Sequence, residues 1–234
     1  MTTATLTRQT YAGVYLPSET AAYLRAGLPP AVRHRPTSRR VQRWISAGLT
    51  APQSREVKPR QRILDFADLI TCQVISILRS KDISLHAIRE AEAYLRDHYG
   101  FDKPFAYRAV WYLVPDIFTK LDNGVLLAAS RRGQAAFKFL EPLLKAVEVT
   151  LVFSDATPRA RVVAWEPEPG ITIQPDVQFG QSCLAGTRIP TSALWSYVAA
   201  GDPPEFVAES YGIEVADVER AVSWEERVRA RISS

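Results

Sequence analysis

Cysteine, histidine and methionine are scarce in this 234-residue sequence. Cys72 and Cys183 lie 111 positions apart, and neither belongs to a zinc-knuckle or CxxC spacing. His34, His86 and His98 form no HExxH motif and no Cys/His cluster. We therefore expect no metal site and no cofactor, and we expect both cysteines to be buried or inert thiols.

Catalytic signatures and long apolar runs are missing as well. The sequence contains no GxSxG, P-loop or GxGxxG motif, and adjacent acids such as Glu225 and Glu226 point to different faces of a predicted helix. These absences predict a protein that is not an enzyme. No run approaches the roughly 18 apolar residues of a membrane helix, and residues 1–10 lack an apolar signal core, so we expect a cytoplasmic protein with no membrane association.

What the sequence does have is one concentrated basic block, from Arg33 to Arg62. It holds nine Lys/Arg and one acid, Glu56, a net charge of +8. Removing this block from the totals of 29 basic and 25 acidic residues leaves 20 and 24, a net charge of −4 elsewhere. Such a block, interleaved with apolar residues, favours binding of nucleic acid over a merely solvated surface.

Residues 38–48 of this block predict a recognition helix. Val41, Trp44 and Ile45 recur at helical spacing and predict a buried stripe, while the polar side chains surround it. A first helix is expected from Ser18, and a proline-rich loop over 28–36 separates the two helices. The predicted DNA contacts on the second helix are Thr37, Ser38, Arg39, Arg40, Gln42 and Arg43.

The end of the block predicts a short basic hairpin, or wing, over residues 53–62. It has no helical apolar stripe, and apolar character resumes at Ile63. We expect Arg55, Lys58, Arg60 and Arg62 to contact mainly phosphates and to set the salt dependence of binding. Two amphipathic helices follow, capped by Asp65 and Ser84.

This order of elements resembles the MerR-type winged helix-turn-helix. The matching residues run from Arg43-Trp44 through Gly48-Leu49 to Pro52, and from Arg62 through Phe66 to Asp68-Leu69. The stretch from Ile77-Leu78-Arg79 to Ile88-Arg89 is also similar, with Lys81-Asp82 where a glycine is usual. The resemblance implies a winged helix-turn-helix DNA-binding domain, which we place at residues 14–100.

Residues 101–168 predict a small α+β middle domain. Short β-like runs occur at 111–114, 117–121 and 125–128, and Asn123-Gly124 is typical of a hairpin turn. A helix is expected over 135–147, followed by strands at 147–153 and 159–165, and the proline-rich residues 166–170 predict a linker or turn. The predicted fold class is therefore mixed α+β and mainly helical, ending in a trihelical, helix-turn-helix-like domain at 169–234.

The C-terminal region carries a second resemblance. It is similar to a short bacterial family catalogued as a domain of unknown function and regarded as VapB-type antitoxins. The matching residues are Gly180, Gly186, Thr187, Arg188, Ile189, Pro190, Ala200, Gly201, Glu205, Tyr211, Gly212, Val218 and Ala221. We expect Leu194, Tyr197, Val198, Phe206, Val207, Val218 and Val222 to form the inside of this domain.

The antitoxin resemblance implies a partner, a PIN-domain ribonuclease toxin with a carboxylate-lined active site. The residues that match such a partner in charge or lie in the same charged tail are Arg188, Trp224, Arg227, Arg229 and Arg231. Two readings stay open here. Arg188 either pairs with a carboxylate of its own chain or contacts the partner, and the tail is either an exposed helix end or a binding segment.

Together these patterns predict an antitoxin that neutralises a PIN-domain (VapC-type) ribonuclease and represses its own operon by binding operator DNA as a homodimer. One alternative is a MerR-like regulator that senses a small molecule through a middle-domain pocket lined by Phe105, Trp111, Tyr112 and Phe118. Another is an interaction adaptor in which neither helical domain touches DNA.

Overall fold

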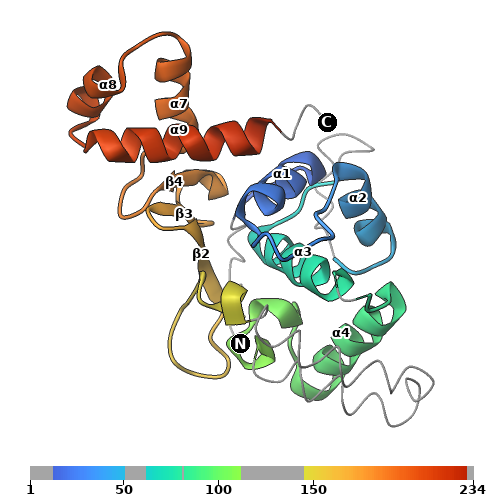
Figure 1. Ribbon diagram of the computed structural model, residues 1–234. Helices are drawn as coiled ribbons and strands as arrows, with labels where there is room; N and C mark the ends of the chain where they lie inside the picture. Colours follow the sequence, from blue (N-terminus) through green and yellow to red (C-terminus); the bar gives the residue numbers. More distant parts are fainter. Residues whose placement is uncertain (1–12, 51–61, 81, 112–144, 231–234) are drawn as a thin grey trace, which may run out of the picture.

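The structure, a computed structural model, describes residues 13–50, 62–80, 82–111 and 145–230. Within these ranges helices dominate and the strands form a small four-stranded antiparallel sheet (Figure 1). The predicted mixed α+β, mainly helical class is therefore confirmed. The predicted wing residues Arg55, Lys58 and Arg60, the hairpin at Asn123-Gly124 and the tail residue Arg231 lie outside the described residues.

The N-terminal part of the described chain contains the helices α1 (Pro17–Gly27), α2 (Ser38–Ser46), α3 (Phe66–Arg79) and α4 (Leu85–Tyr99). The predicted caps Asp65 and Ser84 are confirmed, since their side chains accept hydrogen bonds from Asp68 N at 2.9 Å and Ala87 N at 3.1 Å. The predicted cap Ser18 is wrong. The N-cap of α1 is Leu16, whose amide donates to Glu19 Oε2 at 2.7 Å, because Pro17 already takes the first helical position.

A shared apolar core holds these helices together. Leu24 of α1, Val41 and Trp44 of α2 and Leu69 of α3 are each at most 4% exposed. Tyr15, before α1, forms an antiparallel bridge with Leu64, before α3, through two hydrogen bonds of 2.9 Å. The bridge brings the starts of α1 and α3 together. Helix α2 packs on this core with its apolar face, and its polar face is exposed.

The sheet joins the middle of the chain to its C-terminal part. Its strands are β1 (Leu151–Phe153), β2 (Val162–Glu168), β3 (Ile171–Ile173) and β4 (Ser182–Leu184), paired in that order. The domain boundary predicted after residue 168 falls within the β2–β3 hairpin, where Gly170 takes the left-handed φ of 85° that the turn requires. Residues 166–168 therefore belong to a strand rather than to a linker.

Two of the predicted strands differ from the structure. Trp111 belongs to a helical turn that begins at residue 108, and Val147 lies in a helical turn at 145–148, so β1 starts only at Leu151. Both stretches are rich in β-branched or aromatic residues, and that preference is weak enough for tertiary packing to override it. Val147 is fully buried and Trp111 is 6% exposed, which shows where the packing acts.

Three helices follow the sheet: α7 (Thr191–Ala199), α8 (Pro204–Tyr211) and α9 (Val215–Arg229). Between β3 and β4 lies the short 3-10 turn η2 (Gln178–Gly180). Leu194, Val207 and Val218 are buried as predicted, but Tyr197 and Phe206 are 47% and 58% exposed. The prediction that these two aromatic residues lie inside was wrong. With only three helices in the described part of this region, one side of α7 and of α8 stays open to solvent.

Helix α1 connects the two ends of the chain. It contacts α2 on one side and α9 and β2 on the other, and Figure 1 shows α9 running from above the sheet toward α1. The rings of Tyr23 on α1 and Trp224 on α9 stack with centroids 6.3 Å apart. Gly27 lies so close to β2 that a Cβ built on it would stand 2.6 Å from Trp165. The DNA-binding candidate α2 and the C-terminal helices are therefore packed on one common element.

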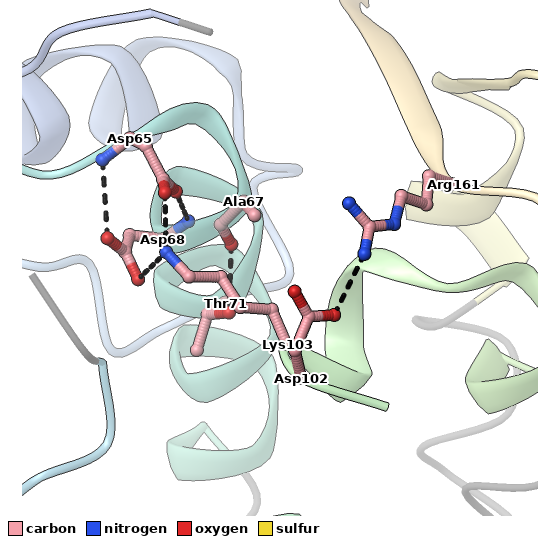
Figure 2. Close-up of polar contacts among 7 residues, drawn as sticks. All are labelled: Asp65, Ala67, Asp68, Thr71, Asp102, Lys103 and Arg161. Atoms are coloured by element: carbon pink, nitrogen blue, oxygen red, sulfur yellow. Dashed lines mark hydrogen bonds and ion pairs between the residues drawn. The ribbon is translucent and has the colours of Figure 1, made fainter. Parts of the chain in front are cut away.

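A half-buried ion cluster fixes α3 to the segment before the short 3-10 turn η1 (Pro104–Ala106). Figure 2 shows Lys103 reaching Asp65 and Asp68, with Nζ 2.6 Å and 3.0 Å from their carboxylate oxygens. Next to Lys103, Asp102 pairs with Arg161 of the β1–β2 connection at 3.0 Å. The cluster links the first four helices to the sheet.

Candidate nucleic-acid interface

Helix α2 separates its apolar and basic residues cleanly. Val41, Trp44 and Ile45 are at most 4% exposed, so Trp44 is a core residue as expected. Arg39, Arg40 and Arg43, together with Gln42, are exposed on the opposite side. One face of the helix is thus used for folding, and the other is free for a partner.

The start of α2 is also the end of the helix at which anions bind. Thr37 is the N-cap, and its Oγ1 accepts a hydrogen bond from Arg40 N at 3.3 Å. Ser38 opens the first turn, where unpaired backbone N–H groups and the positive end of the helix dipole favour a phosphate. Because the first turn contains no acid, the charges of Arg39 and Arg40 add to this field.

No acidic side chain neutralises these arginines in the part of the chain that the structure describes. The salt bridges found there are made by other basic residues. These residues lie on α4, just before η1, just before β2 and on α9. The side chains of Arg39 and Arg43 also make no hydrogen bond with described residues, and Arg40 Nη1 donates to the carbonyl of Arg35 at 3.3 Å. Among the described residues no acid therefore occupies the α2 arginines, and the side chains of Arg39 and Arg43 have their donors available for a partner.

Two further arginines extend the basic face at the C-terminal end of α2. Arg62, the one predicted wing residue inside the described ranges, donates to Ser46 Oγ at 3.2 Å. Arg89 of α4 donates to the carbonyl of Ala47 at 3.4 Å. Sequence reasoning missed Arg89 because it comes 42 positions after Ala47 and its place beside α2 depends on tertiary packing.

Arg35, also part of the basic block, has a structural role instead. Its guanidinium donates to the carbonyl of Arg25, and to that of Leu28 at 3.2 Å, both at the C-terminal end of α1. A cation at this end satisfies carbonyls that lack helical partners. The net charge of the block therefore overstates what is available to a partner.

The predicted toxin contacts are not brought together on one free surface. Trp224 is fully buried against Tyr23. Arg227 pairs with Glu168, and Arg229 pairs with Glu225 at 3.1 Å while lying 3.7 Å above the Trp195 ring. These residues stabilise α9 against its neighbours, so the described part of the tail is an integral helix of the fold.

Arg188 differs from the tail arginines. Its side chain is exposed and forms no salt bridge with any described residue. Its carbonyl accepts a hydrogen bond from Gln178 Nε2 at 2.9 Å, which ties the loop after β4 to η2. Of the two roles left open by the sequence, internal pairing with a carboxylate is therefore not seen among the described residues.

A small pocket of about 210 Å³ lies where α1, β4, α7 and α9 meet. Its buried carboxylate, Glu225, is already satisfied by Thr191 Oγ1 at 2.6 Å and by Arg229 at 3.1 Å. The pocket that the sequence predicted in the middle region is not seen in its described part, because Phe105 and Trp111 are buried core residues and Tyr112 and Phe118 lie outside the described ranges.

Two buried carboxylates near the ion cluster have raised pKa values. Burial raises the pKa of Asp68 from 3.8 to about 6, although the Lys103 ammonium opposes the change. Burial likewise raises the pKa of Glu92 on α4 from 4.5 to about 7, against the attraction of Arg96. Both side chains are buried, so they bear on folding rather than on DNA contact.

Other kinds of site find little support within the described ranges. They contain no group of three or more His, Cys, Asp or Glu side chains placed to hold a metal ion. None of the helices drawn from these residues combines the length and the apolar character needed to cross a lipid bilayer. Both cysteines are buried, and burial raises the pKa of the Cys183 thiol to about 11.

Comparison with known proteins finds a family that matches part of the chain and a solved structure with a similar fold. The family described as "Protein of unknown function (DUF433)" matches residues 171–224, from β3 to α9. The X-ray crystal structure of Rv2018 from Mycobacterium tuberculosis is similar, with a TM-score of 0.68 and 14% identity over 89% of this chain and 96% of that chain. No curated protein matches. At 14% identity the likeness to Rv2018 is one of fold.

Proposed function

We propose that this chain is a DNA-binding antitoxin: α2 docks on the duplex of its own operator, and another surface binds and silences a PIN-domain ribonuclease. The observation that carries the DNA part is the exposed face of α2, where Arg39, Arg40 and Arg43 have no acidic partner among the described residues. A folded domain gains nothing in stability from gathering unpaired like charges, so this face is best explained by a polyanion.

The elements around α2 suit a helix-turn-helix. Its buried stripe packs on α1, and its capped N-terminus with Thr37 and Ser38 is turned outward. In this arrangement the first turn of α2 enters a major groove, where arginine recognises guanine edges or phosphates. Arg62 and Arg89 then lie at the other end of the helix, suited to the backbone of the duplex.

Asp82 supports the resemblance to the MerR type. It has a φ of 62°, a left-handed conformation that favours glycine, at the position where that family usually has one. The backbone therefore keeps the glycine-like turn between α3 and α4 although the side chain has changed.

The antitoxin part rests on the resemblance of the Gly186-Thr187-Arg188-Ile189-Pro190 motif, within the region matched by DUF433. A homodimer on a palindromic operator belongs to the same proposal, since two-fold protein symmetry matches two half-sites. Co-expression with the product of the neighbouring gene tests this part. We expect a PIN-type ribonuclease that is inactive in the complex, and a neighbour that neither binds nor is silenced would overturn the antitoxin assignment.

DNA binding is tested separately, by titrating a duplex from upstream of the gene with the wild type and with Arg39→Ala, Arg40→Ala and Arg43→Ala variants. Loss of a good arginine–base contact costs about 1–3 kcal/mol, so each variant is expected to bind roughly 5- to 150-fold more weakly. Arg159→Ala, at an exposed arginine before β2, is the matched control and should bind as the wild type does. Equal loss in the control would show that only the total charge matters.

A further inference from the structure

The turn η2 presents an aromatic side chain in a way that folding alone does not explain. Phe179 is 79% exposed, the most exposed aromatic residue among the large apolar side chains of the described chain. It also has a φ of 56° between Gln178 at 47° and Gly180 at 87°, so three successive residues are left-handed. The left-handed conformation is unfavourable for Gln and Phe, and exposure of the ring gains nothing from the hydrophobic effect.

Gly180 shows why the turn has this shape. A Cβ at Gly180 would stand 2.2 Å from the Tyr15 hydroxyl, so the backbone must pass tightly over that ring. No such contact requires a phenylalanine at position 179, where glycine or asparagine would fit the same φ at lower cost. Strained, exposed positions of this kind are concentrated at binding sites.

The turn is held rigidly from both sides. The carbonyl of Phe179 accepts a hydrogen bond from Val14 N at 3.1 Å, which joins it to the segment before α1. The side chain of Gln178 donates to the carbonyl of Arg188 at 2.9 Å, which joins it to the loop after β4. A rigid presentation lowers the entropy cost of binding, as expected for an anchor residue.

The neighbours of Phe179 define the chemistry of its partner. Val14, 49% exposed, extends the apolar surface, and Arg188 adds an exposed guanidinium without a salt bridge among the described residues. Asp176 is exposed three positions before Phe179, so the surface lacks the concentrated positive charge that a nucleic acid needs. It fits a protein with an apolar pocket that is bordered by a carboxylate.

We propose that Phe179, together with Arg188 of the loop that Gln178 ties to η2, is the anchor that binds the ribonuclease partner, in place of the C-terminal tail that the sequence indicated. This inference rests on the antitoxin part of the proposed function and names its contact surface. Phe179 fills the apolar pocket, and Arg188 donates to the carboxylate next to it. The tail arginines Arg227 and Arg229 are engaged within the fold and do not take part.

Affinity of purified Phe179→Ala for the ribonuclease encoded beside this chain, measured by titration calorimetry, tests the assignment. Aromatic anchors dominate interface energies, so we expect binding about 30-fold weaker, and about 10-fold weaker for Arg188→Ala. Phe206→Ala is the matched control, since it removes another exposed ring, 58% exposed on α8, and it should bind as the wild type does.

A glycine variant separates binding from folding. Phe179→Gly suits the left-handed backbone, so it should melt no lower than Phe179→Ala and yet bind as weakly. If the wild type binds the ribonuclease and the Phe179 variants bind equally well, the inference is wrong and the antitoxin function stands. If the wild type does not bind, both fall. A Phe179 variant that alters self-association instead would assign this surface to a second copy of the chain and would also overturn the inference.

Discussion

Asp82 is a single residue whose conformation disagrees with its side chain. Its φ of 62° costs an L-residue about 1 kcal/mol or more, although aspartate tolerates this region better than most. We expect Asp82→Gly to be at least as stable as the wild type and Asp82→Ala to unfold about 1 kcal/mol more easily than Asp82→Gly. Urea denaturation of the two variants measures the difference, and equal midpoints would contradict the left-handed turn.

Glu92 makes stability depend on pH. Because burial raises its folded pKa from 4.5 to about 7, the folded protein binds more protons than the unfolded chain between these values. The free energy of unfolding should therefore be highest at the acid end of this window and fall as pH rises through it, by on the order of 2 kcal/mol. Asp68, with its pKa raised to about 6, acts in the same direction.

Replacement of Glu92 by glutamine isolates its share, since the amide oxygen can still accept from Arg96. Chemical denaturation at pH 5, 6, 7 and 8 should give a flatter profile for Glu92→Gln than for the wild type. Asp97→Asn, exposed on the same helix, serves as the control and should leave the slope unchanged. A wild-type profile that rises with pH through this window, with no difference in Glu92→Gln, would contradict the assignment.

At the scale of elements, α1 packs tightly against β2. A Cβ at Gly27 would stand 2.6 Å from Trp165 and 2.7 Å from Pro167. Alanine normally stabilises a helix relative to glycine by up to about 1 kcal/mol, but here the clash should dominate and Gly27→Ala should lower the free energy of unfolding by roughly 1–2 kcal/mol. The sign of the change in the free energy of unfolding is the test. If thermal or urea unfolding showed Gly27→Ala to be more stable than the wild type, α1 would not pack on β2 as described.

Elements with strong local signals could be predicted from the sequence. Thr37, Asp65 and Ser84 are side-chain caps followed by periodic apolar residues, and the helices after them lie where expected. Strand positions were less predictable. Trp111 and Val147 belong to residue types that favour strands, but tertiary packing overrides that preference and both residues are helical. Ser18 failed as a cap because Pro17 and Glu19 already form a helix start at Leu16.

The candidate sites divide in the same way. The exposed arginines of α2 follow from helical periodicity alone, so the sequence could locate them. The buried state of Trp224 could not be predicted, since it depends on stacking against Tyr23 of α1, far away in the sequence. Nothing local marks Phe179 as exposed either, because an aromatic residue is more often buried than exposed and the left-handed backbone arises from the close contact of Gly180 with Tyr15.

For the whole molecule, positive charge is concentrated in one stretch of the sequence. The basic block carries +8 and the remainder of the chain −4, which orients the protein toward a polyanion. The C-terminal surface around Phe179 is separate from α2 in sequence and carries little net charge, so one chain could hold DNA and a protein partner by different chemistry. The predicted homodimer and the domain boundaries stay predictions at this scale.

The most direct test of the central claim is the salt dependence of operator binding, measured by fluorescence anisotropy from 50 to 200 mM salt for the wild type and for the Arg39→Ala/Arg40→Ala/Arg43→Ala variant. We predict tight binding by the wild type, with a slope of log affinity against log salt that is shallower in the variant by between about 1 and 3, together with loss of preference for operator over random duplex. Equal slopes and equal preference in the two proteins would contradict DNA recognition by α2.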